Sequence, residues 1–510
     1  MARVGEEQLL GTGTTSSSRG KDAEAESSSP NEQSQSYNEE SEPIERKIKL
    51  PARDLFKQIL LACTIHSVVI QAGINLSFSA VLLPQLAAEY NASTESLNNA
   101  TSPTETPTTN NNSTIYIDKD AASWIASLVT LSLPLGALIV GSLMDKFGRK
   151  RIAMLTTIPF TTGWLLHYWA QNVNMIYAAR IIAGFGSGLS TVCLIYVAEL
   201  SHPKLRAMLL NLNSLFVCFG ILITCAIGSV LHWRTMSLCY ATLSLSSCLS
   251  IMLLPESPHW LHSFKNKTSH ATKILSWLYS DDAVFQIEER RLWDNQIQRQ
   301  RQTYRDIAAT FTTPIVYKPL QLLFILFLLQ QLTGCYVIVF YAVDVFKLIG
   351  NGMDEYSALI LLGAIRFVAA ILSSITSIRL GRKILLITSA AGMLVSALLA
   401  ASSVGHTTSW CVLSYVAFGS IGVLVIPWTL IGELLPLKVR GKLGGFLFAL
   451  AYLFMFGMVK GYPYLSAIVE IRTMFYWLVG VNAVMIYFVA ARLPETFGKS
   501  FRQIEEYFLA

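Results

Sequence analysis

The sequence predicts an all-α membrane protein in which twelve transmembrane helices form two similar six-helix bundles. Composition, the length of the apolar segments and an internal repeat lead to this prediction. Of the 510 residues, 52% are hydrophobic and 14% are charged, whereas a soluble protein carries about 25% charged residues. The net charge of +6 is spread over short clusters, which gives no reason to expect a nucleic-acid partner.

Apolar segments of roughly 20 residues, the length that a bilayer core requires, recur along the whole chain. Each is long enough to cross the membrane as a helix. The twelve segments are residues 58–83, 122–143, 152–170, 175–198, 208–231, 235–254, 319–346, 356–377, 384–402, 410–432, 443–463 and 472–491.

Short motifs in the loops reveal the internal repeat. "KFGRK" resembles "RLGRK", and Gly148 and Gly381 in these motifs lie 233 residues apart. "ELSHPKLRA" resembles "ELLPLKVRG", and Glu199 and Glu433 lie 234 residues apart. A nearly constant offset indicates two halves in parallel register. Duplicated bundles of this kind are typical of secondary transporters, whose substrate site lies between the halves.

Lysine and arginine gather in alternate loops, which predicts the topology. "DKFGRKR" follows the second apolar segment and "RLGRK" follows the eighth. By the positive-inside rule both termini and residues 255–318 face the cytoplasm. The loop 84–121 then faces outside, and it carries four N-glycosylation motifs, at Asn91, Asn99, Asn111 and Asn112.

These signals divide the chain into five regions. The first is expected to be a disordered tail because it is rich in Ser, Glu, Gln and Asn and has few aliphatic residues. The regions are the N-terminal tail 1–50, the first bundle 51–254, a cytoplasmic linker with short helices 255–318, the second bundle 319–491 and a cytoplasmic C-terminal tail 492–510.

Charged residues at the predicted cytoplasmic helix ends form a second recurring pattern. We expect ion pairs of Asp145 with Arg149, of Glu199 with Arg206 and of Glu433 with Arg440, with Arg382 as the counterpart of Arg149. Ion pairs across a cytoplasmic seam would hold the halves together there and favour an outward-open state. The alternative is that these charges only anchor helix ends and set topology.

The sequence contains no constellation expected of an enzyme. No P-loop, Ser/His/Asp set or metal-ligand spacing occurs, so neither a metal nor a cofactor is predicted. The eight cysteines fall in or at the ends of apolar segments and are interpreted as small core residues.

Several strings together resemble the sugar porter branch of the major facilitator superfamily. They are "GSLMDKFGRK", "ARIIAGFGSGL", "YVAELSHPKLRA", "PESPHWL", "QQLTG", "IPW", "GELLPLKVRG" and "LPETFGKSFRQIEE", and the resemblance spans about residues 55–508. "GINLSFSAVLLPQL" is most similar to insect facilitated trehalose transporters. The resemblance implies the major facilitator fold and alternating-access transport of a sugar without covalent chemistry. With no organelle address in the sequence, the plasma membrane is the expected location.

The resemblance also implies a substrate site. Gln330, Gln331 and Trp428 match residues that face the central cavity of sugar porters. An amide both donates to and accepts from sugar hydroxyls, and an indole suits the C–H face of a pyranose. The alternative for the glutamines is a role between helices, with hydrogen bonds worth about 0.6–2 kcal/mol each.

Proton-coupled sugar porters carry an aspartate in the first span, where this chain has Asn75. An amide does not take up and release a proton near neutral pH. The resemblance therefore implies an uncoupled facilitator.

Other positions of the family's cavity differ in this chain. Tyr336 and Arg366 replace asparagines, and Ser214 replaces a glutamine. These changes make the expected site more aromatic and more positive, and they leave two alternatives to hexose or trehalose transport. Arg366 could recognise a different polar or anionic solute, or the chain could be a weakly transporting nutrient sensor.

Overall fold

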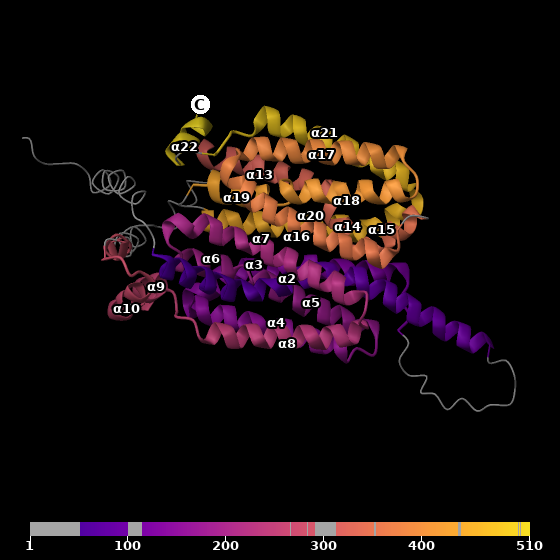
Figure 1. Ribbon diagram of the computed structural model, residues 1–510, viewed down its shortest axis with the longest axis horizontal. Coiled ribbons are helices and arrows are strands. Elements are labelled where there is room, and N and C mark those ends of the chain that lie inside the picture. Colours follow the sequence, from indigo (N-terminus) through magenta and orange to yellow (C-terminus); the bar gives the residue numbers. More distant parts are fainter. Residues whose placement is uncertain are drawn as a thin grey trace, which may run out of the picture. The chain divides into compact units, whose positions relative to one another are not determined.

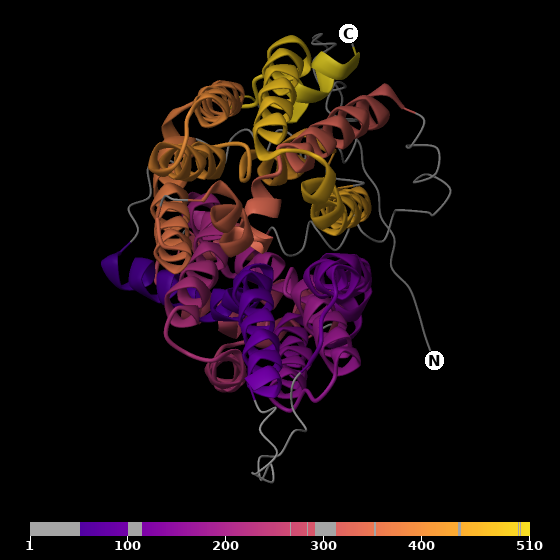
Figure 2. The ribbon, with the colours of Figure 1, turned by 90° about the vertical axis from the view of Figure 1, so that its right-hand side faces the viewer.

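The computed structural model describes residues 51–99, 115–265, 267–282, 284–290, 313–350, 353–436, 440–497, 499 and 501–509. Every regular element in this part of the chain is a helix. The helices form two groups, coloured indigo to magenta and orange to yellow in Figures 1 and 2. We call α2–α8 the first half and α13–α21 the second half.

The first half confirms the first six predicted spans, although one of them is two consecutive helices. Within it α3 packs on α5, α2 on α7, and α4 on α5 and α8. Its helices are α2 (Ala52–Asn99), α3 (Lys119–Phe147), α4 (Arg149–Tyr168), α5 (Val173–Leu189), α6 (Val192–Leu200), α7 (Pro203–Gly228) and α8 (Trp233–Met252).

The second half repeats this organisation, and its helices α17, α18 and α21 pack together. Two of its predicted spans are interrupted. Its helices are α13 (Pro314–Leu332), α14 (Cys335–Phe340), α15 (Ala342–Ile349), α16 (Glu355–Arg379), α17 (Arg382–Ser402), α18 (His406–Ile421), α19 (Ile426–Leu434), α20 (Arg440–Ile468) and α21 (Ile471–Arg492).

Eleven of these helical segments are long and apolar enough to cross a membrane. The remaining predicted span, 152–170, corresponds to α4, which has 20 residues but is not among the eleven. Its sequence begins with three basic residues and contains four threonines, which lower its hydropathy. Packing between α5 and α8 gives α4 protein rather than lipid on those faces.

Three of the predicted spans contain a break in the helix. The segment 175–198 breaks between α5 and α6, 319–346 breaks after Leu332, and 410–432 breaks between α18 and α19. At the second break Gly334 has φ 65°, a left-handed conformation that suits glycine. The hydropathy of the sequence does not reveal these breaks, because the residues on both sides of each break are apolar.

The predicted start of the loop 84–121 needs correction, and the predicted tail and linker contain helices. The loop predicted to begin at residue 84 is still helical there, because α2 continues through Pro84 to Asn99. The C-terminal tail contains α22 (Phe501–Leu509), which packs on α13 and α19. The linker helices α9 (Pro258–Lys265) and α10 (Thr268–Leu278) pack on each other, α9 also on α3 and α6, and α10 also on α2. The predicted N-terminal tail, 1–50, lies outside the described residues.

Figure 1 shows α9, α10 and α22 at one end of the helices, which we call the linker end. The opposite end, where α3 begins and α15 lies, is called the far end. The two halves meet through α3 with α20 and through α7 with α16, while α14 and α15 pack on α2. These helices form the interface at which any central site must lie.

Candidate functional site

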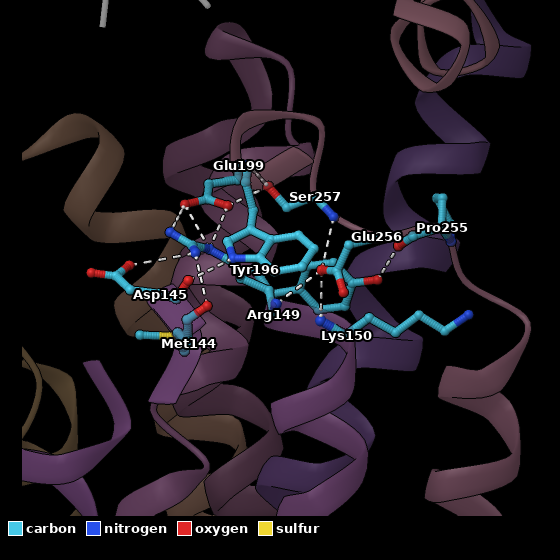
Figure 3. Close-up of polar contacts among 10 residues, drawn as sticks. Met144, Asp145, Arg149, Lys150, Tyr196, Glu199, Pro255, Glu256 and Ser257 are labelled. Atoms are coloured by element: carbon cyan, nitrogen blue, oxygen red, sulfur yellow. Dashed lines mark hydrogen bonds and ion pairs between the residues drawn. The ribbon is translucent and has the colours of Figure 1, made fainter. Parts of the chain in front are cut away.

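A network of charges at the linker end of the first half surrounds Arg149 (Figure 3). Its guanidinium donates to Glu199 at 2.9 Å and to the Met144 carbonyl at 3.2 Å. The other Glu199 oxygen accepts from the Ser257 hydroxyl. Asp145 lies 3.6 Å from Arg149, as the sequence predicts. Arg149 is buried, so Glu199 supplies the counter-charge that its guanidinium needs.

A second carboxylate in this network caps a helix. Glu256 Oε1 accepts from the backbone N–H groups of Arg149 and Lys150, each at 2.9 Å. These donors are the unpaired amides at the N-terminus of α4. Gly148 before them has φ 99°, and a Cβ there would lie 2.6 Å from the Glu256 carboxylate. The glycine therefore serves both the turn and the approach of Glu256.

The second half repeats these contacts. Arg382 donates to Glu433 at 3.0 Å, and the other Glu433 oxygen accepts from the Thr496 hydroxyl at 2.5 Å. Glu495 accepts from the backbone N–H groups of Arg382 and Lys383 at 2.8 and 3.2 Å. The geometry thus agrees with the internal repeat predicted from the sequence. The roles of Glu256 and Glu495 were missed, although their "PES" and "PET" context repeats too.

The predicted pair of Glu199 with Arg206 is not observed, and the predicted pair of Glu433 with Arg440 is not tested. Glu199 pairs with Arg149, whereas Arg206 donates weakly to the Ser201 carbonyl at 3.4 Å. Glu433 pairs with Arg382, and the side chain of Arg440 lies outside the described residues. Among the described residues, each ion pair at the linker end lies within one half. These pairs stiffen each half, and ion pairs across a cytoplasmic seam remain a prediction.

Gln330 connects two broken helices. Its Nε2 donates to the Val423 carbonyl at 2.7 Å, in the turn between α18 and α19. Such a turn leaves backbone carbonyls unpaired, and a side-chain donor satisfies one of them. Gln331 Nε2 lies 3.5 Å from Gln330 Oε1. Gln330 therefore makes a contact between helices, and its role in substrate binding stays a prediction, as does that of Gln331.

Aromatic side chains gather next to these breaks. The Trp428 ring lies 4.7 Å from Phe327, 4.9 Å from Phe448 and 5.5 Å from Tyr452, measured between centroids. Tyr336 lies near Trp428. Trp428 and Tyr336 are only half-buried, so each has a face that a solute could cover.

Arg366 joins this cluster from α16. Its guanidinium lies 5.9 Å from the centroid of the Tyr336 ring and near the Cys218 thiol of α7, across the interface. The residue is 4% exposed, and its Nε and Nη1 have no hydrogen-bond partner among the described residues. The structure thus brings Arg366, Tyr336 and Trp428 together, as expected from the sequence.

In the described part of the chain, no hydrogen bond joins Asn75 or Ser214 to this cluster. Asn75 is fully buried within the first half and donates to the Ala183 carbonyl and the Ser187 hydroxyl, both at 3.2 Å. Arg180 donates to the Asn75 carbonyl at 3.2 Å. Both Asn75 contacts on α5 use the amide N–H₂, which a carboxylate lacks. Ser214 is half-buried on α7.

The sequence did not point to a polar contact between the halves at the far end. Lys460 Nζ of α20 lies 2.7 Å from Asp120 Oδ1 and 2.6 Å from the Ser123 hydroxyl of α3. It also lies 4.1 Å from the centroid of the Trp124 ring, and the Tyr464 hydroxyl donates to Asp120. We call this set the Lys460 latch. A lone lysine inside an apolar span was the signal that could have found it.

Curated relatives share much of this chain. The facilitated trehalose transporter Tret1 of Bombyx mori is 31% identical over 412 residues, covering 77% of this chain and 80% of that protein. A Tret1-2 homolog of Drosophila sechellia is 30% identical over 403 residues, covering 76% of this chain and 82% of that protein.

Solved structures and a family match agree with these relatives. The xylose transporter XylE from E. coli, in a partially occluded inward-open conformation, superposes with a TM-score of 0.66 at 18% identity, covering 86% of this chain and 99% of that one. That likeness supports the fold alone. The family described as "Sugar (and other) transporter" matches residues 61–508. The chain therefore belongs to this family of sugar and other transporters and is a membrane transporter, not an enzyme.

Proposed function

We propose that this protein moves a small sugar, such as a hexose or trehalose, across the plasma membrane by facilitated diffusion. The observation that carries the proposal is the half-buried cluster of Tyr336 and Trp428 beside the helix breaks, with Gln331 close by. Aromatic faces and amide groups are what a sugar ring and its hydroxyls need. The curated relatives are named for facilitated transport of trehalose, which supports the same substrate class.

The distribution of contacts supports alternating access. Several contacts across the interface, such as the Lys460 latch and the hydrogen bond from the Ser79 hydroxyl to the Phe340 carbonyl, lie toward the far end. The ion pair of Arg149 with Glu199 lies within the first half, and that of Arg382 with Glu433 lies within the second half. Two internally braced halves that separate at one end while closing at the other would expose the site to each side in turn.

Transport is expected to be uncoupled from protons because Asn75 stands where a titrating carboxylate would be needed. Uptake of labelled glucose or trehalose into cells expressing the protein should stop at the outside concentration and should not change with a proton ionophore. The control is the same uptake in cells without the protein. Accumulation above the outside concentration that the ionophore abolishes would contradict the uncoupled mechanism.

The far end is proposed to face outside, with both termini cytoplasmic. Asn91 is exposed on the far-end extension of α2, where an oligosaccharide could be attached; Asn111 and Asn112 lie outside the described residues. Glycosidase treatment should increase gel mobility, and replacing Asn91, Asn99, Asn111 and Asn112 with glutamine should remove that change. A glycan attached within residues 255–318 would reverse the proposed orientation.

A further inference from the structure

Arg366 is at the middle of a candidate membrane span and at the interface of the halves. It is the central residue of the span Glu355–Ser377, about 17 Å from either end at a rise of about 1.5 Å per residue. One turn earlier, a Cβ on Gly363 would lie 3.1 Å from Cys225 of α7. One residue later, Phe367 lies 5.7 Å from Phe219 of α7. Arg366 therefore lies among contacts between α16 and α7, and these contacts must change when the halves move relative to each other.

The surroundings of Arg366 do not balance its charge. No described carboxylate forms an ion pair with it, and two of its N–H groups lack a hydrogen-bond partner in the described part of the chain. Its neighbours are the Tyr336 ring and the Cys218 thiol, and a thiol is a weak acceptor. A buried cation in a membrane span is costly and marks a functional site by default. Its missing partner is an acceptor that carries negative charge.

We infer that Arg366 binds an oxyanion group on the transported solute, so that the preferred substrate is a sugar acid or sugar phosphate. This inference rests on the proposed transport function and defines its substrate class. Guanidinium groups recognise carboxylates and phosphates through charge-assisted hydrogen bonds. Tyr336 lies between Arg366 and Trp428, so a sugar ring against the two aromatic residues would bring a charged substituent to the guanidinium.

Binding to the purified full-length protein tests the inference without transport. We expect D-glucuronate to raise the thermal unfolding temperature more than D-glucose does, since the two differ only in the charged group. Glucose 6-phosphate in a third arm distinguishes phosphate from carboxylate recognition. Arg366→Gln should weaken binding of the anion by about ten- to a hundredfold, as expected for a lost hydrogen bond to a charged group, and leave glucose binding in place.

The matched control is Arg472→Gln, which removes one positive charge from an exposed position at the start of α21 and should preserve the preference for the anion. If Arg366→Gln does not fold, Arg366→Lys keeps the charge and should retain a reduced preference. Equal stabilisation by glucose and by both anions in the wild-type protein would overturn the inference. So would an anion preference that survives Arg366→Gln unchanged.

Uptake into proteoliposomes separates this inference from the proposed function. Uncoupled movement of an anion carries charge, so an inside-positive potential should increase glucuronate uptake and leave glucose uptake unchanged. Glucose uptake without binding or uptake of either anion would overturn the inference and keep the proposed function. If no solute is transported, the proposed function fails, and the thermal shifts with the anions alone decide whether Arg366 binds them.

Discussion

Replacing Glu199 with glutamine is expected to destabilise the protein by about 2–4 kcal/mol, because the change leaves a buried guanidinium without its counter-charge. In the structure Arg149 and Glu199 expose only 9% and 18% of their side chains, and their charged atoms lie 2.9 Å apart. The amide keeps the size of the carboxylate and removes its charge. Thermal unfolding of the purified protein and its amount at the cell surface measure the effect.

Two comparisons make this prediction specific. Asp145→Asn removes a carboxylate that is 43% exposed and 3.6 Å from the same Arg149, and it should cost at most about 1 kcal/mol, as expected for exposed pairs. Glu433→Gln removes the equivalent charge from the second half and should act in the same direction as Glu199→Gln. A Glu199→Gln protein as stable as the wild type would show that the pair does not brace the first half.

Much of the fold could be predicted because the bilayer imposes it on the sequence. A span needs about 20 apolar residues, and such segments can be counted without knowing any contact. The repeat was equally visible, since Gly148 with Gly381 and Glu199 with Glu433 keep their spacing. The resemblance to sugar porters over residues 55–508 is confirmed by the family match over residues 61–508.

The details that failed are those that depend on partners far away in the chain. Glu199 was assigned to Arg206, seven residues further on in the same motif, but its partner Arg149 lies 50 residues before it. The helix break between α18 and α19 is stabilised by Gln330, which is 93 residues from Val423. Local pattern and hydropathy contain no information about such pairs, because both describe only neighbouring residues.

The candidate site, like the fold, could be predicted only in part. The sequence suggested Gln330, Gln331, Tyr336, Trp428 and Arg366, and the structure brings the last three together. It could not separate the two glutamines, which have the same chemistry and adjacent positions. Only the contact of Gln330 with a backbone carbonyl shows that this amide is already used. Substrate contacts are therefore expected from Gln331 more than from Gln330.

The Lys460 latch gives the second large effect, on conformation. Lys460 Nζ contacts Asp120 and Ser123 and lies over the Trp124 ring, so three residues of the first half hold one cation of the second. Both an exposed ion pair and a cation–π contact favour the closed far end. Lys460→Gln should therefore shift the balance between closed and open far ends by roughly tenfold toward open.

Cys225 reports this opening. It is 1% exposed and lies against Gly363 of the other half, so a membrane-impermeant thiol reagent added outside should modify it faster in Lys460→Gln and in Asp120→Asn. Modification of Cys225 is the difference in labelling between a protein with Cys225 and the same protein with Cys225→Ser. Lys347→Gln, at an exposed position of α15 at the same end, is the control and should react at the wild-type rate. An unchanged rate in Lys460→Gln would mean that apolar contacts between α7 and α16 keep the far end closed without the latch.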